Sequence, residues 1–204
     1  MNLPTELHSA QAARWPVSGE HILAHFDDES IVVYQAYRPE TALYALEHGH
    51  FGGPTYSFNR MSWIKPNFLW MMYRCGWVTK PGQEMVLGLR IRRTFFDRVL
   101  AGAVASSWQP DRHATREAWK EAVEASDVRL QWDPDHDPLG APLERRAVQL
   151  GLRGPTLRAF ATDELLEVID MTPFVHAQRP LALARDAGLL MPREQVYVPG
   201  QCAC

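Results

Sequence analysis

The order of strand-like and helix-like segments limits the folds open to this chain more than any other feature. Residues 30–37 are rich in β-branched and aromatic side chains, and residues 84–93 carry the apolar residues Val86, Leu87, Leu89 and Ile91, so both segments are predicted as β-strands. Residues 39–49 lie between them and are typical of a helix, with proline in the first turn and Gly49 as the C-cap. The first half of the chain therefore combines both kinds of element.

The rest of the chain continues this mixture. Further strands are predicted at residues 128–132, 145–154 and 194–200. Helices are predicted from residue 66 onward and at residues 94–104, 115–126 and 179–188, while residues 155–172 combine features of both. Because the elements do not follow a regular β-α-β alternation, we expect an α+β fold of mixed, mostly antiparallel sheets with flanking helices.

Length and composition fit one folded domain. The chain has 204 residues, of which 46% are hydrophobic and 22% charged, so it can build a substantial core. We expect a single domain over residues 1–204, with an N-terminal arm at residues 1–20 and a C-terminal tail at residues 200–204. The net charge of −3 argues against a generally basic nucleic-acid-binding coat but allows a local basic patch.

The cysteines and the N-terminus predict a cytoplasmic protein. The three cysteines are Cys75, Cys202 and Cys204, an odd number without a Cys-x-x-Cys pair, which favours free thiols over a disulfide scaffold. Residues 1–16 contain no apolar core of a signal peptide, and no apolar run reaches about 18 residues. We therefore expect no membrane partner. Cys75 lies near the end of a predicted helix, where the dipole disfavours a reactive thiolate.

The sequence contains no strong local motif for catalysis or metal binding. Phosphate-binding glycine loops, His-Glu-x-x-His and Gly-x-Ser-x-Gly are all missing. The acidic stretch at residues 133–140 could attract a hard cation, but it lacks the glycine and glutamate of the common calcium loop. We predict a hairpin tip with solvated charges there. The eight histidines are scattered, so no metal site is expected.

The stretch RMSWIKPNFLWMMYRCGW, residues 60–77, combines cations with large aromatic side chains. Arginine matches phosphate and carboxylate groups bidentately, and aromatic faces stack on nucleobases. A nucleotide or a nucleic-acid strand would therefore suit this stretch. The alternative is an aromatic-rich core helix whose arginine and lysine side chains extend to solvent. We assign the aliphatic members to the core and leave both possibilities open for Arg60, Lys65 and Arg74.

Four segments together resemble the family catalogued as domain of unknown function 4291. These are YQAYRPE at residues 34–40, the stretch at residues 60–77, QWDP at residues 131–134 and QLGLRG at residues 149–154. The resemblance runs from about residue 31 to residue 199. It implies family membership, and it brings no established activity with it.

A second resemblance concerns the toxin-type ADP-ribosyltransferases. In that fold a strand with a Tyr-Arg or Tyr-His pair leads to a helix that ends in glycine and an aromatic residue, as VVYQAYRPETALYALEHGHF does here. The arginine or histidine holds NAD there, but this chain has Gln35 at that position and Arg38 three residues later. The segment REQVYVPG resembles the fold's last motif, where Gln195 stands in place of the glutamate and Glu194 lies one residue away.

This resemblance implies a candidate site. Its catalytic residues would be Gln35, Glu194 and Gln195, with Ser62 on the strand that lines the nicotinamide pocket. A carboxylate would orient the ribose and cations would hold the diphosphate. The residues expected to bind NAD are Tyr34, Arg38, Arg60, Ser62, Trp63, Lys65, Trp70, Tyr73 and Arg74.

Three functions follow as hypotheses. The first is an ADP-ribosyltransferase-like protein that binds NAD or a related nucleotide in a cleft lined by arginine and tryptophan, and that transfers ADP-ribose. The alternative is a non-catalytic module for a nucleotide or single-stranded nucleic acid. The third is an unrelated enzyme with a small polar substrate. The first hypothesis predicts two orthogonally packed antiparallel sheets, with Tyr34 and Gln195 on facing strands across the cleft.

Overall fold

The strand β4, Ser30–Tyr37, forms one edge of the first, three-stranded sheet. A computed structural model describes residues 3–200 of the chain. In it β4 pairs antiparallel with β6, Met85–Arg92, over its whole length, and β6 pairs antiparallel with β10, Leu165–Asp170. The predicted strands at residues 30–37 and 84–93 are confirmed, the second one residue shorter at each end.

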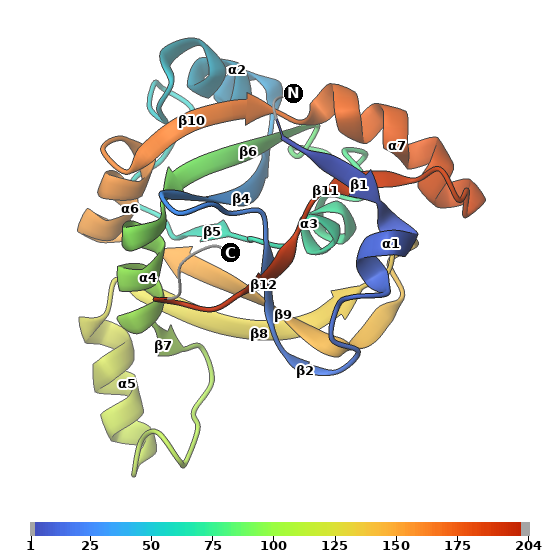
Figure 1. The fold of residues 1–204 in the computed structure, drawn as a ribbon. Coiled ribbons are helices and arrows are strands. Elements are labelled where there is room, and N and C mark those ends of the chain that lie inside the picture. The colour runs from blue at the N-terminus through green and yellow to red at the C-terminus, as the bar shows by residue number, and fades with distance from the viewer. Residues whose placement is uncertain (1–2, 201–204) are drawn as a thin grey trace.

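The second sheet is built around a long hairpin and forms a separate layer (Figure 1). Its main strands, β8 at Val128–His136 and β9 at Pro142–Leu152, are antiparallel. The short strand β5, Ser62–Ile64, pairs antiparallel with the end of β9. At the edges, β2 at Gly19–Glu20 runs parallel to β9 and β7 at Val104–Ala105 runs parallel to β8. The predicted α+β class with mostly antiparallel sheets is confirmed.

A backbone bridge joins the two sheets at Tyr34 on β4 and Lys65 just after β5. The backbone N–H of Tyr34 donates to the carbonyl of Lys65 at 2.7 Å, and the N–H of Lys65 donates to the carbonyl of Tyr34 at 3.3 Å. This pair is an isolated bridge, so the ladder does not continue toward Tyr37 and Ser62. The two strands therefore leave room between them on that side.

Helices flank the sheets at several places (Figure 1). The helix predicted from residue 66 begins at Phe68, where the Asn67 side chain accepts a hydrogen bond from the Trp70 N–H at 2.7 Å. It ends at Gly76, which has a left-handed backbone with φ of 61°. The helices are α1 His8–Ala12, α2 Pro39–His48, α3 Phe68–Cys75, α4 Arg93–Ala101, α5 Arg116–Ala125, α6 Gly154–Ala161 and α7 Thr172–Ala184. No helix within residues 3–200 is long and apolar enough to cross a membrane.

Side chains of β4 alternate between two apolar clusters. Ile31 and Val33 point into the cluster that includes the second sheet, whereas Val32 and Tyr34 point into the cluster that includes α3 and α7. Phe68, Leu69 and Met72 of α3 all belong to the second cluster and are almost fully buried. Their assignment to the core is confirmed, so part of the aromatic-rich stretch serves packing.

The N-terminal segment packs against the end of the chain. Its strand β1, Thr5–Leu7, pairs antiparallel with β11, Leu190–Pro192, and the buried Trp15 indole donates to the Glu194 carbonyl at 3.1 Å. The next strand, β3 at Ile22–Ala24, pairs with β12 at Gln195–Tyr197. The expected arm at residues 1–20 is thus part of the packed structure over the residues described. Residues 201–204 of the expected tail lie outside them.

The acidic stretch differs from its prediction as a solvated hairpin tip. Strand β8 continues through it to His136, and the Asp135 side chain is only 1% exposed. Arg145, opposite on β9, forms an ion pair with Asp135 at 2.6 Å and donates to the Pro16 carbonyl at 2.6 Å. The prediction failed because local sequence does not show that a distant arginine and the N-terminal segment cover this aspartate.

We expect Arg145→Ala to lower the free energy of unfolding by about 3–5 kcal/mol, because Asp135 would remain buried without its partner. Urea denaturation monitored by tryptophan fluorescence measures this change. Arg14→Ala removes an exposed ion pair with Glu6 and should leave stability nearly unchanged. Equal effects of the two substitutions would contradict the assignment of a structural role to the buried pair.

Candidate functional site

A strongly polar pocket lies where β4 and β5 separate beyond the Tyr34–Lys65 pair. We call it the cationic pocket, and its cavity volume is about 630 Å³. It is lined by the end of β4 and the start of α2, by residues 55–63, by α3, and by side chains from β8 and β9. The pocket therefore lies between the two sheets, at the position where they are joined.

Four cations line the cationic pocket: Arg38, Arg60, Lys65 and Arg74. No aspartate or glutamate contributes to its lining, and none of the four forms an ion pair with a carboxylate of residues 3–200. Arg90 and Arg153, in contrast, are held by protein groups elsewhere. The pocket thus concentrates uncompensated positive charge in a chain whose net charge is −3.

Lys65 is the most deeply placed of these cations. Its side chain is 4% exposed, and its Nζ lies 5.1 Å from the centroid of the Trp70 ring. The pKa of Lys65 is lowered to about 8, mainly by burial and also by the nearby positive charge of Arg74, whereas the negative charge of Asp133 opposes the shift. Trp70 does not line the pocket but forms the support on which this amine rests.

Gln35 connects the two strands across the inner end of the pocket. Its amide nitrogen donates to the Ser62 Oγ at 2.8 Å and to the Trp63 carbonyl at 2.9 Å, and its oxygen accepts from the Tyr37 hydroxyl at 2.8 Å. Burial raises the pKa of Tyr37 well above its ordinary value, so this phenol stays neutral. All polar groups of the Gln35 side chain are therefore engaged with the protein.

A pair of glutamines on the second sheet forms the opposite wall. Gln131 on β8 and Gln149 on β9 are direct cross-strand neighbours, and both line the pocket. The carboxylate of Asp133 accepts from the Gln131 amide nitrogen at 2.9 Å and from the Gln149 amide nitrogen at 2.7 Å. Because both nitrogens face Asp133, both amide oxygens point away from it as hydrogen-bond acceptors.

Sequence reasoning missed this glutamine pair, although a signal was present. Gln131 lies on the strand predicted at residues 128–132, and Asp133 follows directly after it, two residues on, so both side chains share one face where the strand continues. Gln149 lies within the strand predicted at residues 145–154. What the sequence could not show is the register that places Gln149 opposite Gln131.

Three residues predicted to bind NAD do not line the cationic pocket: Tyr34, Tyr73 and Trp70, whose ring lies beneath the Lys65 amine. Tyr34 is fully buried, and its ring packs edge-on against Phe68 with centroids 5.4 Å apart. Tyr73 is exposed and stacks on His136 with centroids 3.5 Å apart. Arg38, Arg60, Ser62, Trp63, Lys65 and Arg74 do line the pocket.

Glu194 and Gln195, expected as catalytic residues, also lie outside the pocket. Glu194 is 1% exposed and accepts from the Phe68 N–H at the start of α3 at 2.8 Å. Burial raises the pKa of its carboxyl group well above the ordinary value. Gln195 lies on β12, which pairs with β3, while the pocket wall across from β4 comes from β8 and β9. The expected arrangement of Tyr34 and Gln195 facing each other across a cleft is therefore not found.

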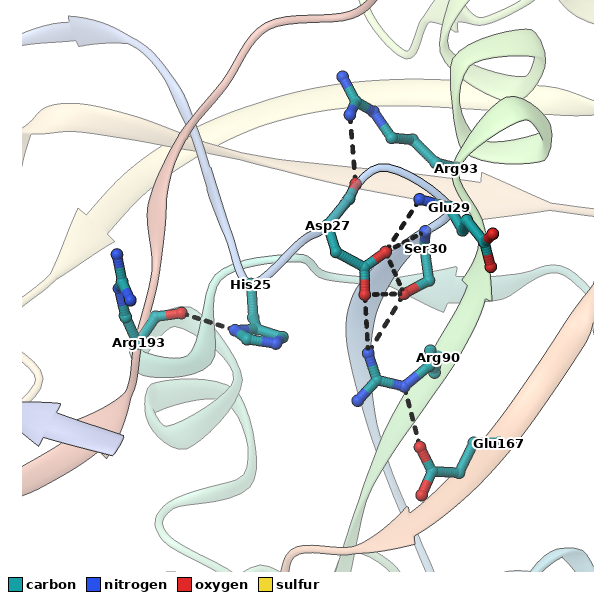
Figure 2. Close-up of polar contacts among 8 residues, drawn as sticks. All are labelled: His25, Asp27, Glu29, Ser30, Arg90, Arg93, Glu167 and Arg193. Carbon is teal, nitrogen blue, oxygen red and sulfur yellow. Dashed lines mark hydrogen bonds and ion pairs between the residues drawn. The ribbon is translucent and has the colours of Figure 1, made fainter. Parts of the chain in front are cut away.

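A second polar cluster, shown in Figure 2, lies near the entry to β4. The Asp27 carboxylate accepts from the Ser30 N–H at 2.7 Å and lies 3.7 Å from the Arg90 guanidinium. Arg90 also forms an ion pair with Glu167 at 2.9 Å, and Arg93 donates to the Asp27 carbonyl at 3.2 Å. These contacts tie β4, β6, β10 and α4 together, so the cluster has a structural role.

Cysteine and metal chemistry find no further support in the described part of the chain. Cys75 is buried, its thiol donates to the Met72 carbonyl at 3.7 Å, and burial raises its pKa. No group of three or more His, Cys, Asp or Glu side chains that could hold a metal ion occurs within residues 3–200.

A family model described as "Domain of unknown function (DUF4291)" matches residues 21–197. The chain belongs to this family. No curated protein gives a significant match to the chain. All four segments that carry the DUF4291 resemblance contribute to the cationic pocket, among others through Arg38, Arg60, Gln131 and Gln149. The segments are far apart in the sequence, and the fold brings them together at this place.

We expect Lys65→Met to raise the free energy of unfolding at pH 7 by on the order of 1–3 kcal/mol, because it replaces a buried, unpaired cation by an apolar side chain. Since the lysine pKa is lowered in the folded state, this penalty is fully present below about pH 8 and disappears as pH rises toward the unfolded value. Denaturation at pH 7 and at pH 9.5 measures both effects. A destabilised Lys65→Met protein would assign Lys65 a structural role instead.

Proposed function

We propose that the cationic pocket binds a phosphorylated, nucleotide-like ligand, a class to which NAD and ADP-ribose belong. The observation that carries this proposal is the convergence of four cations without a carboxylate partner. Cations held together in this way repel one another, and an anion relieves the repulsion. Such an arrangement costs stability and is expected where a ligand supplies the missing negative charge.

The arrangement of the cations suits phosphate groups. Arg38, Arg60 and Arg74 are exposed at the pocket and can present their planar guanidinium groups to phosphate oxygens bidentately. Lys65 lies deeper and acts as a compact positive charge. A diphosphate could therefore contact several of these groups at the same time.

The remaining walls suit the uncharged part of a nucleotide. The amide oxygens of Gln131 and Gln149 can accept hydrogen bonds from sugar hydroxyls or from an amino group of a base. Tyr56 and Trp63 add aromatic side chains to the lining, on which a base can stack. The volume of about 630 Å³ is within the usual range of pockets for small molecules.

Binding without transfer is the function that this geometry favours. Transfer of ADP-ribose would require a carboxylate near the ribose, yet no aspartate or glutamate lines the pocket within residues 3–200. Glu194 is buried at the start of α3. A single-stranded nucleic acid would need a cationic groove along which the strand can run, whereas these cations converge on one pocket.

We expect ADP-ribose, NAD or a nucleoside diphosphate to raise the melting temperature, because a ligand selective for the folded state stabilises it. Arg38→Ala should lower the affinity at least about tenfold through loss of a charge-assisted contact, with little change in stability. Thermal shift and isothermal calorimetry measure these effects.

Arg112→Ala is the matched control, because Arg112 is exposed and does not line the pocket. Its affinity should equal that of the unchanged protein. If none of the phosphorylated compounds shifts the melting temperature at millimolar concentration, the proposed function is wrong. If Arg38→Ala and Arg112→Ala weaken binding equally, the ligand is held by general charge rather than by this pocket.

A second test concerns the glutamine wall. Gln149→Leu removes one acceptor, so we expect about a fivefold to tenfold loss of affinity for ADP-ribose and almost none for inorganic phosphate. Calorimetry with both compounds gives this comparison. A parallel loss for both would show that the substitution disturbs the cationic side as well, and no loss for either would remove the glutamine pair from the binding site.

A further inference from the structure

Lys65 places a primary amine inside the cationic pocket, and we propose that this amine is a nucleophile that forms an imine with a phosphorylated aldehyde or ketone. The proposal rests on the proposed function, since the arginines would hold the phosphate of the same molecule. It adds a covalent step to the binding, and it narrows the ligand class to compounds that carry both a phosphate and a carbonyl group.

The backbone holds this amine in a fixed place. Lys65 exchanges two hydrogen bonds with Tyr34, and Pro66 and the helix-capping Asn67 follow directly. Its side chain then lies against the Trp70 indole, whose centroid is 5.1 Å from Nζ. A nucleophile held in one position loses little entropy when it attacks a bound carbonyl group.

The amine has no competing partner among residues 3–200. No carboxylate lies within ion-pair distance of Lys65 Nζ, and no hydrogen-bond acceptor is bound to it. Asp133, the carboxylate whose charge acts on Lys65, already accepts from the amides of Gln131 and Gln149. A lysine amine that is unpaired, buried and close to a second cation, here Arg74, is in the environment that activates lysine nucleophiles.

Opposing effects act on the charge of this amine, and burial is the largest one. Burial and Arg74 favour the neutral amine, whereas the charge of Asp133 and the cation–π contact with the Trp70 ring favour the ammonium form. The resulting pKa of about 8 leaves a substantial neutral fraction near neutral pH. An ordinary lysine, with a pKa near 10.4, has almost none.

The step is balanced without a further reactant. The lone pair of the neutral amine attacks the carbonyl carbon, and a nitrogen–carbon bond replaces the π-bond of the carbonyl group. The two protons of the amine leave with the former carbonyl oxygen as one water molecule, and a carbon–nitrogen double bond remains. No oxidant or reductant is consumed in this exchange.

Reductive trapping tests the proposal directly, because the chain has only three lysines, Lys65, Lys80 and Lys120. The protein is incubated at pH 8 with glycolaldehyde phosphate and sodium cyanoborohydride, and peptide mapping by mass spectrometry locates the label. We expect Lys65 to be labelled at least about tenfold faster than the exposed Lys120. Lys65→Arg keeps the charge and should remove this fast labelling.

A second arm separates this proposal from the proposed function. Propanal has the aldehyde but no phosphate, so it should label Lys65 over Lys120 with lower selectivity than glycolaldehyde phosphate does. In the Arg38→Ala protein, the selectivity of glycolaldehyde phosphate should fall to the level of propanal. Fast labelling of Lys65 by both aldehydes would support the nucleophile and contradict phosphate binding. A thermal shift with glycolaldehyde phosphate but equal labelling of Lys65 and Lys120 would contradict the nucleophile and leave phosphate binding in place.

Discussion

The two reciprocal backbone hydrogen bonds between Tyr34 and Lys65 are the contact on which the arrangement of this protein depends. They join a three-stranded sheet to a sheet built around a long hairpin, and they end the pairing after a single step. A longer ladder would close the space in which the cationic pocket lies. The pair also fixes how the cations on the two sides of the pocket are placed relative to one another. The same pair of hydrogen bonds therefore holds the two sheets together and leaves the pocket open.

Much of the fold could be predicted, because its central elements follow local rules. Strand β4 and the helix ending at Gly49 have sharp sequence limits, set by β-branched residues, a proline and a glycine with a left-handed backbone. The buried ends of β8 and β9 could not be predicted, since Asp135 looks like a turn residue until Arg145 and the N-terminal segment cover it. The same holds for the packing of Trp15 against the end of the chain.

The site was partly predictable for a related reason. Residue type singled out Arg60, Lys65 and Arg74 as candidates and the transferase resemblance added Arg38, and these four cations lie together in the structure. The positions of the other residues in the pocket wall depend on strand register and sheet packing, which local sequence patterns do not show. The resemblance to transferases therefore directed attention to Glu194, a residue that caps a helix, instead of the glutamine pair on β8 and β9.

The Asp133 carboxylate fixes the orientation of the Gln131 and Gln149 amides. The two sides of the cationic pocket are therefore chemically different. Rotating either amide would turn an N–H group toward the ligand but would set an oxygen against the carboxylate, and the two would repel each other. This wall therefore accepts hydrogen bonds and disfavours anionic groups, whereas the arginine side attracts them. A molecule with one charged end and one hydroxyl-rich end can enter in only one orientation, and a molecule charged at both ends fits poorly.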